Sequence, residues 1–333
     1  MQEITISSHF FRSALSKAAE RGLPTAQLLA EARISQQLFN QTAVRITATQ
    51  YAKLQTLTMR ALDDEMLGYG SRPIPVGSWS LVCHWLLSCT DIGDALSRLC
   101  LCFRLMEKGF KLDLISDSSL TGLRITPWDD SQPEPYAYEL FMFGIHRILC
   151  WLAKDMIPTR EIHLPYRLPQ QADEYRVMFP HARVCFDSDR CELVLEASAK
   201  TLPIKQKTED LIEFLHNPML SIIVNSYNEK SWTVKTQDYL RQHLQEIPTL
   251  LEVATEFGIH TKALRKALEK EGISYGDLKS QLRRDVAIQY LTNTDKTIEA
   301  IAELIGFSET STFTRAFKTW TRMTPKQYRH SVS

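Results

Sequence analysis

Two groups of side chains near the carboxyl-terminal end have the types that contact nucleic acid. One group is Lys262, Arg265 and Lys266, and the other is Thr310, Ser311, Thr314, Arg315 and Lys318. Ammonium, guanidinium and hydroxyl groups donate hydrogen bonds to phosphate oxygens and base edges. The spacing of each group fits one polar face of a helix whose opposite face is apolar. The sequence therefore predicts two polar-faced helices that could meet a nucleic acid.

Each polar helix lies in one copy of an internal repeat. The copies are LLEVATEFGIHTKALRKALEKEG, residues 250–272, and IEAIAELIGFSETSTFTRAFKTW, residues 298–320. Ala254 and Gly258 correspond to Ala302 and Gly306 at an offset of 48, and Leu264, Ala267 and Leu268 correspond to Phe313, Ala316 and Phe317 at an offset of 49. A small Ala suits a close helix crossing, and Gly can end the first helix with positive φ. The pattern predicts two helix-turn-helix units. The alternative is a pair of helical hairpins used only for packing.

A third helix is expected between the copies, over residues 275–291. Its apolar residues, including Leu278, Leu282 and Val286, share one broad face. At 1.5 Å per residue such a helix is about 24 Å long. It could hold the two units about one DNA turn, roughly 34 Å, apart.

Residues 236–330 resemble the DNA-binding domain of the AraC/XylS family of bacterial transcription regulators. The resemblance is carried by EVATEFGI, LRKALEKEG, DVAIQYL and IEAIAELIGFSETSTFTRAFKTWTRMTPKQYR. It implies an all-α domain, residues 236–333, with two helix-turn-helix units joined by a connecting helix. It also implies double-stranded DNA, RNA polymerase and a second copy of the chain as partners.

The resemblance assigns DNA contacts residue by residue. Its recognition helices map to residues 261–270 and 309–319. Lys262, Arg265 and Lys266 become candidates for base edges in the first, and Thr310, Ser311 and Thr314 in the second. Arg315 is expected to contact a phosphate or a carboxylate, and the alternative for it is an internal salt bridge. The expected contacts of Lys318, Lys326 and Arg329 are phosphates, and the alternative for each is a solvated surface charge.

The helix caps depart in part from the family pattern. We expect Ser308 to cap the second recognition helix. Where the family has Ser before the first, this chain has His260-Thr261, and Thr261 is expected to cap instead. For Arg283 and Arg284 on the connecting helix, a structural ion pair is expected for at least one.

Residues 1–200 resemble the arabinose-binding-like effector domain of ornithine-utilisation-type members of the same family. The stretches that carry this are DDEMLGYGSRPIPVGS and DIGDALSRLCLCFRLM. The pattern before residue 110 is helical. A hairpin is expected where FKLDLI and LTGLRIT alternate apolar and polar residues across an SDSS turn. A helix is expected over residues 136–153. Three further strands are expected at REIHL, ARVCFD and CELVLEA, the last two around an SDR turn. The expected fold is α+β, followed by a helical linker over residues 201–235.

A small-molecule site is the functional hypothesis for this effector domain. His146 and Arg147 interrupt the apolar helix 136–153, and a buried charge needs a partner. A ligand carboxylate is one such partner. The candidate ligand-binding residues are Trp79, His84, Arg98, Tyr138, His146 and Arg147. For each, core packing or a structural ion pair is the alternative.

The same domain is expected to carry dimerisation. Leu211, Ile212, Leu215 and neighbouring apolar linker residues could form the dimer surface or dock onto the chain's own effector domain.

Composition limits the remaining functions. Residues 231–333 hold 15 Lys/Arg against 12 Asp/Glu, a net of +3, whereas the whole chain is balanced at 39 each. Seven Cys, an odd number without CxxC pairs, indicate free thiols rather than disulfides or a zinc module, so no metal and no cofactor are expected. No signal peptide or apolar run long enough to span a membrane is visible, so a cytoplasmic location is expected.

We therefore expect a DNA-binding transcription regulator modulated by a small metabolite. One alternative is a regulator, for example of virulence or quorum-sensing genes, controlled by a protein partner or by its own expression level. A remote alternative is an enzyme fused to a DNA-binding module. Catalytic or nucleotide-binding signatures such as GxSxG, HExxH, GxGxxG and GxxxxGK[ST] are missing from the sequence, so we expect no enzyme activity.

Overall fold

A computed structural model describes residues 4–41, 44–224 and 231–332. Its contacts divide the chain into two compact units. One, the C-terminal unit, comprises Met1–Arg12, Pro24–Leu54 and Asn228–Ser333, and the other, the sheet unit, comprises Ser13–Leu23 and Gln55–Tyr227. Helices α1 (Ser8–Glu20) and α4 (Ala48–Leu62) contribute residues to both.

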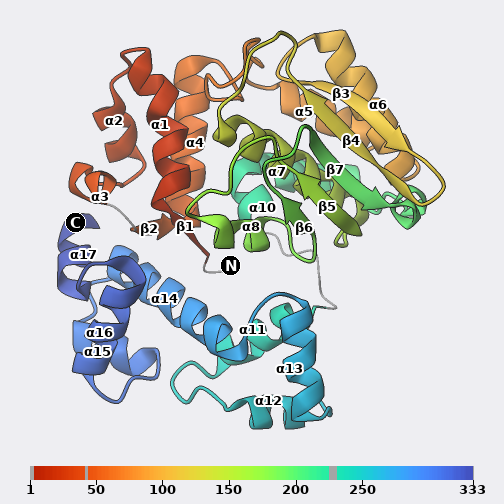
Figure 1. The fold of residues 1–333 in the computed structure, drawn as a ribbon. Helices are drawn as coiled ribbons and strands as arrows, with labels where there is room; N and C mark the ends of the chain where they lie inside the picture. The colour runs from red at the N-terminus through yellow and green to blue at the C-terminus, as the bar shows by residue number, and fades with distance from the viewer. Residues whose placement is uncertain (1–3, 42–43, 225–230, 333) are drawn as a thin grey trace. The chain divides into compact units, whose positions relative to one another are not determined.

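The sheet unit is a mixed α+β structure (Figure 1). Its further helices are α5 (Ser78–Leu86), α6 (Ile92–Met106), α7 (Pro135–Ala153), α8 (Ala172–Met178), the 3-10 helix η1 (Ala197–Thr201), α9 (Thr208–His216) and α10 (Pro218–Val224). Its strands are β3 (Lys111–Ser116), β4 (Leu120–Thr126), β5 (Thr159–His163), β6 (Arg183–Cys185) and β7 (Cys191–Glu196). The expected α+β class is confirmed.

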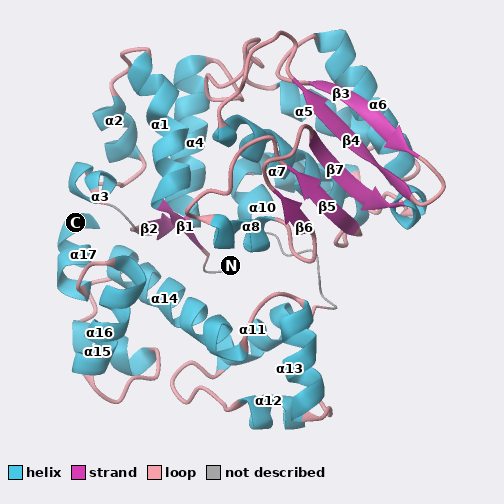
Figure 2. Ribbon diagram, in the orientation of Figure 1, coloured by secondary structure: helices cyan, strands magenta, loops and turns pink. Residues whose placement is uncertain are grey.

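The five strands form one sheet in the order β3-β4-β7-β5-β6 (Figure 2). The β3–β4 hairpin is confirmed, with Lys111 opposite Thr126 and Ser116 opposite Thr121. The sequence places β6 and β7 around a short turn, but they are not neighbours. β7 instead inserts between β4 and β5, where Leu193 and Leu195 are fully buried. With a neighbouring strand on each side, Cys191 to Leu195 of β7 are all buried, and only Glu196 at the end of the strand is exposed.

Helix α7 is the centre of the sheet unit. Fifteen of its nineteen residues are buried, from Tyr136 to Ala153. It packs against β7 and α10, whereas α6 packs against β3. The helix predicted at residues 136–153 is thereby confirmed. Its apolar character on most faces reflects neighbours on several sides rather than a membrane, and among the described residues no helix is long and apolar enough to span one.

The described residues of the C-terminal unit form helices apart from one short strand pair. Its C-terminal helices are α11 (Trp232–Gln242), α12 (Leu250–Glu256), α13 (Thr261–Lys270), α14 (Tyr275–Asn293), α15 (Ile298–Leu304), α16 (Thr310–Thr321) and α17 (Pro325–Val332). Figure 1 shows α12 and α13 at one end of α14 and α15 to α17 at the other. The remaining elements are α2 (Thr25–Glu31), α3 (Gln36–Asn40) and the antiparallel strands β1 (Thr5–Ser7) and β2 (Arg45–Thr47).

The amino-terminal strand pair packs on the connecting helix. Thr5 Oγ1 donates to the buried Asp285 carboxylate of α14 at 2.6 Å, and Arg45 Nε donates to Thr5 Oγ1 at 2.8 Å. The Tyr328 hydroxyl of α17 donates to the Arg45 carbonyl at 2.6 Å. Segments about 280 residues apart in the chain thus share one buried polar network.

Candidate nucleic-acid interface

The first helix-turn-helix turn is closed by two backbone hydrogen bonds. Gly258 has φ +65°, its N–H donates to the Thr255 carbonyl at 3.0 Å, and the Ile259 N–H donates to the Ala254 carbonyl at 3.0 Å. This is the left-handed glycine ending expected for α12.

The second turn repeats that geometry at every position. Gly306 has φ +75°, its N–H donates to the Glu303 carbonyl at 3.0 Å, and the Phe307 N–H donates to the Ala302 carbonyl at 2.9 Å. All four residues sit 48 positions after their counterparts. The sequence repeat is therefore a structural repeat, and two helix-turn-helix units are present.

Helix α13 presents a basic outer face. Leu264 and Leu268 are buried at 0% and 1% exposure, whereas Lys262, Arg265 and Lys266 are exposed. A shallow hollow of about 660 Å³ opens at its first turn, lined by His260, Thr261, Lys262, Ala263 and Lys266.

The expected cap of α13 is wrong. Thr261 is the first helical residue, and the capping position is His260, whose side chain makes no capping hydrogen bond. His260 has extended φ and ψ angles, so the helix begins directly after it, one residue earlier than a cap at Thr261 would place the start. The first turn of α13 therefore has no side-chain cap from His260, and residues of this turn line the hollow. An uncapped helix N-terminus favours an anion.

Helix α16 presents a hydroxyl-rich and basic outer face. Phe313 and Phe317 are fully buried, and Ser311, Arg315 and Lys318 are exposed. Thr310 and Thr314 are only half-exposed. Thr312, which lies outside the residues predicted from the sequence, is exposed and accepts a hydrogen bond from Arg315 at 3.4 Å. A helical wheel centred on Phe313 and Phe317 would have placed Thr312 on the outer face.

The cap predicted at Ser308 is also wrong. The residue before α16 is Glu309, and its side chain makes no capping bond but accepts from the Ser311 hydroxyl at 3.0 Å. The extra residue in the second turn moves the helix start past Ser308. Within the described part of the chain no carboxylate lies within ion-pair distance of Arg315, so its guanidinium faces solvent.

Two predicted phosphate contacts lie on α17. Lys326 is exposed near the start of this helix. Arg329 is half-buried, and its Nε and one terminal nitrogen are shielded from solvent. Lys326 is therefore the more accessible of the two.

The connecting helix binds the second unit through Arg283. The Arg283 guanidinium donates to the Gly306 carbonyl at 2.6 Å and lies 4.5 Å from the centre of the Phe307 ring. Burial lowers its pKa. Arg284 pairs with Asp285 at 2.8 Å, which confirms the expected ion pair for one of the two arginines. At 1.5 Å per residue the nineteen residues of α14 span about 28 Å.

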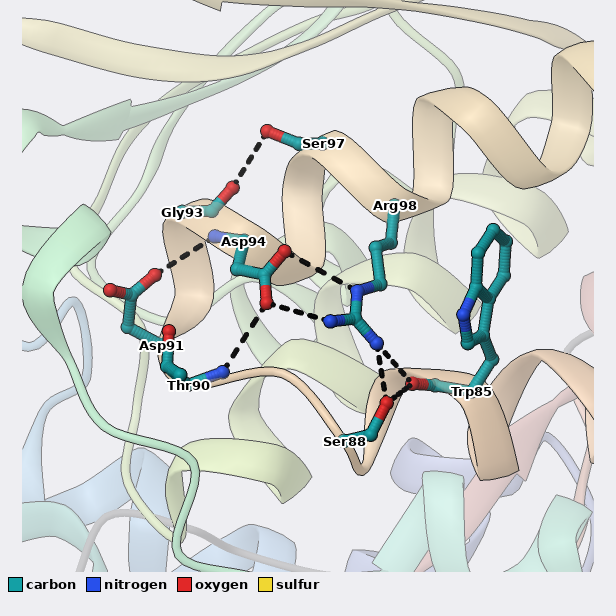
Figure 3. A network of polar contacts seen from close by, with 8 residues as sticks. All are labelled: Trp85, Ser88, Thr90, Asp91, Gly93, Asp94, Ser97 and Arg98. Atoms are coloured by element: carbon teal, nitrogen blue, oxygen red, sulfur yellow. Dashed lines mark hydrogen bonds and ion pairs between the residues drawn. The ribbon is translucent and has the colours of Figure 1, made fainter.

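Arg98, a candidate ligand residue, is already fully engaged (Figure 3). Its Nη2 pairs with the Asp94 carboxylate at 3.1 Å, and its Nη1 donates to the Trp85 carbonyl at 3.1 Å and to the Ser88 hydroxyl. The guanidinium also lies 5.9 Å from the Trp85 ring. These contacts join the end of α5 to the start of α6. The nearby candidate His84 is exposed and bonds to the Ser80 carbonyl of its own helix.

Trp79 and Tyr138 belong to an aromatic cluster in the core. Trp79 meets Phe103 and Phe141 at ring distances of 5.8 and 6.3 Å, and Tyr138 meets Phe110 at 5.2 Å. Burial raises the pKa of Tyr138 to about 12.

His146 and Arg147 lie farther along α7. Thr159 donates its hydroxyl proton to the Ile157 carbonyl at 3.0 Å and so accepts from His146 Nε2 at 3.1 Å. The Nε2 atom of His146 then carries the proton, and Nδ1 is the unprotonated nitrogen. Burial lowers the pKa of this imidazole to about 3. Arg147 Nε donates to the Ile222 carbonyl of α10 at 3.0 Å. Each of the six candidate ligand residues thus contacts other groups of the protein.

The linker helices dock onto the sheet unit. Phe214 lies 4.7 Å from Trp151 of α7, Leu211 is fully buried, and Ile212 is 67% exposed. Leu211 and Ile223 are the buried members of the expected apolar stripe, as docking on the chain's own domain, one of the two expected roles, requires.

Two family models match the chain. Residues 22–204 match "Arabinose-binding domain of AraC transcription regulator, N-term", and residues 253–331 match "Helix-turn-helix domain". The first covers more than half of the sequence.

The chain is also similar to individual proteins. The ornithine utilization regulator of Pseudomonas aeruginosa is 23% identical over 323 residues, which is 95% of this chain and 94% of that protein. The regulator VirS of Mycobacterium tuberculosis is 36% identical over 77 residues, 23% of each chain. The crystal structure of the transcriptional regulator CdpR from Pseudomonas aeruginosa covers 97% of both chains at 19% identity with a TM-score of 0.33.

Proposed function

This chain belongs to the AraC family of transcription regulators, and from that premise we propose that α13 and α16 read two segments of one DNA duplex. The protein is a DNA-binding regulator rather than an enzyme. The observation that carries the proposal is the repeated turn, which twice sets a helix with a buried apolar face and an exposed polar face after the same hydrogen-bonded glycine. The 28 Å connecting helix suits two neighbouring major grooves, about 34 Å apart.

Within this proposal the two helices have different roles. Arg265 and Lys266 donate to guanine edges, because exposed cations on α13 reach O6 and N7. Ser311 and Thr312 on α16 read bases through short hydroxyl groups, while Lys318 and Lys326 bind phosphates.

The test begins with genomic fragments selected by the purified protein. On a selected site, Arg265→Ala should relax preference at one base position and cost about 1–3 kcal/mol. Arg104→Ala, which removes an exposed arginine from α6 of the sheet unit, is the charge-matched control and should leave the footprint unchanged. An unchanged footprint and affinity for Arg265→Ala would reject the assignment.

A small metabolite is the proposed signal. Support comes from the match of residues 22–204 to an effector-domain model. Because Arg98 and Arg147 already have protein partners, a ligand that uses either one would share its guanidinium with a native contact or displace that contact. Thermal-shift screening of metabolites tests this, since a ligand of the folded state raises the midpoint. If DNA binding is intact and no compound raises the midpoint of thermal unfolding, control by a protein partner or by expression level is favoured.

Self-association is the proposed route to affinity. Two chains on paired half-sites would bind more tightly through effective concentration. Ile212 on α9 and Leu81 on α5, exposed by 67% and 74%, are the apolar side chains we assign to this contact. Light scattering on Ile212→Glu and Leu81→Glu should show a smaller mass than the parent protein if the assignment is right. RNA polymerase is the further partner that we infer for a promoter-bound regulator, and in vitro transcription tests it.

A further inference from the structure

A row of polar side chains crosses the five-stranded sheet on one face. Asp113 of β3 is opposite Arg124 of β4, which is opposite Glu192 of β7. Glu192 is opposite His163 of β5, and His163 is opposite Cys185 of β6. Residues directly opposite in paired strands point to the same face. Within the first three, Arg124 Nε lies 2.8 Å from the Glu192 carboxylate, and Asp113 pairs with Lys111 of its own strand at 3.1 Å.

The other end of the row has a different character. Glu161 lies two residues before His163 on β5 and so shares its face. One donor atom each from Glu161, His163 and Cys185 lies within 4.8 Å of the other two. The His163 Nε2 and Glu161 Oε2 atoms are 3.0 Å apart. All three side chains are partly shielded, with His163 14% and Glu161 28% exposed.

This donor set suits a borderline-soft divalent cation. Imidazole nitrogen, thiolate sulfur and carboxylate oxygen are the ligands of Zn²⁺, whereas Mg²⁺ and Ca²⁺ take oxygen ligands. In a tetrahedral site the ligand atoms are about 3.3–3.7 Å apart, given bonds of about 2.0–2.3 Å. Side-chain rotations suffice to bring donors within 4.8 Å to that separation.

The surroundings hold the histidine in the required orientation. Ser188 Oγ lies 3.5 Å from His163 Nδ1, which leaves Nε2 for the cation. Backbone hydrogen bonds hold the loop that carries Ser188 next to the end of β5. The Leu164 N–H donates to the Cys185 carbonyl at 2.9 Å, and the Ser188 N–H donates to the Leu164 carbonyl at 3.1 Å. Hydrogen bonds to the second ring nitrogen orient metal-binding histidines in many proteins.

One neighbouring cation must be accommodated. Arg183 Nη1 lies 3.9 Å from Glu161 Oε1, but its side chain is 79% exposed and can move into solvent. Oε2, the oxygen next to His163, remains available to a metal.

The geometry points to a binding site for Zn²⁺ or a similar d-block divalent cation, formed by Glu161, His163 and Cys185 with an open fourth position. On binding, the cation replaces the His163–Glu161 pairing and the thiol proton of Cys185 is released to solvent. The site lies on the sheet and is independent of the DNA-reading helices, so it stands or fails separately from the proposed function.

Cobalt(II) titration of the chelator-stripped, reduced full chain tests the site. We expect one Co²⁺ per chain with a thiolate-to-metal charge-transfer band that Zn²⁺ removes by competition. Cys185→Ser should abolish the band, and His163→Gln should weaken binding at least about 10-fold. Cys100→Ser, which removes another half-exposed thiol, on α6, should retain both band and affinity.

Circular dichroism establishes that each variant is folded. Should Cys185→Ser fail to fold, Ser188→Ala carries the test, with an expected loss of about 10-fold in affinity. A parent protein without the charge-transfer band, a band that survives in folded Cys185→Ser, or a band lost in Cys100→Ser would each overturn the inference.

Discussion

Replacing Gly306 with alanine probes how tightly the second turn is built into the C-terminal unit. An added Cβ would lie 2.6 Å from the Leu244 carbonyl oxygen, 2.9 Å from the Gln245 carbonyl oxygen and 3.0 Å from Arg283 Nη2. Two of these atoms are backbone and cannot rotate away. Gly258, the equivalent residue of the first turn, has no atom within 4 Å of that position. The same substitution therefore meets a crowded site in one copy and open space in the other.

The expected magnitudes follow from this difference. Both glycines have positive φ, so alanine costs about 1–2 kcal/mol at either one through backbone strain alone. At Gly306 the clash adds about 1–3 kcal/mol, as overpacking does elsewhere. We expect Gly306→Ala to cost about 2–5 kcal/mol and Gly258→Ala about 1–2 kcal/mol.

Scanning calorimetry of the two variants and the parent protein measures the difference. For a unit of roughly 150 residues, 1 kcal/mol lowers the midpoint by about 2–4 °C. Footprinting of Gly306→Ala should also lose protection on the side read by α16 while keeping that of α13. Equal midpoints for the two alanine variants would refute the reasoning, because the distinction rests on the crowding at Gly306 alone.

Three further changes test other parts of the molecule. Burial raises the pKa of Glu65 to about 7 from 4.5, so the folded state keeps a proton that the unfolded chain releases, and the free energy of unfolding should fall between about pH 4.5 and 7. Glu65→Gln should remove about 3 kcal/mol of that fall, measured by unfolding at several pH values, and an unaltered pH profile would show that the Glu65 carboxyl is not its source. Asp285→Ala leaves the buried Thr5 hydroxyl and Arg284 without their acceptor and should cost about 2–4 kcal/mol in urea unfolding, whereas the exposed Asp295→Ala should cost almost nothing. Lys326→Ala should weaken binding to all DNA sequences alike and reduce the salt slope by about one, so a loss confined to one sequence would make Lys326 a base reader.

The C-terminal helices were the most predictable part of the chain. Apolar residues at three- and four-residue spacing fix the faces of α13, α14 and α16, and the Ala and Gly positions fix both turns. These signals are local, so they can be read without coordinates. The caps were less predictable, because a single extended residue at His260 or Glu309 decides where each helix starts.

The candidate ligand residues show the limit of local reasoning. Arg98 pairs with Asp94 four residues earlier on α6, a spacing that the sequence does show. Arg147 is different, because the Ile222 carbonyl that accepts from it lies 75 residues away in the chain. Likewise, the strand patterns of β6 and β7 are clear, whereas the order that inserts β7 between β4 and β5 depends on how the whole sheet buries its apolar face.

The amino-acid sequence by itself determined the family, the two helix-turn-helix units and the polar faces that they expose, because these depend on neighbours within about twenty residues. Only the tertiary structure decided that residues 24–54 pack with the C-terminal helices, that Thr5 meets Asp285, and that Glu161, His163 and Cys185 meet on one sheet face. Such contacts join residues that are distant in the chain, and their partners are chosen by the packing of complete elements rather than by any local pattern.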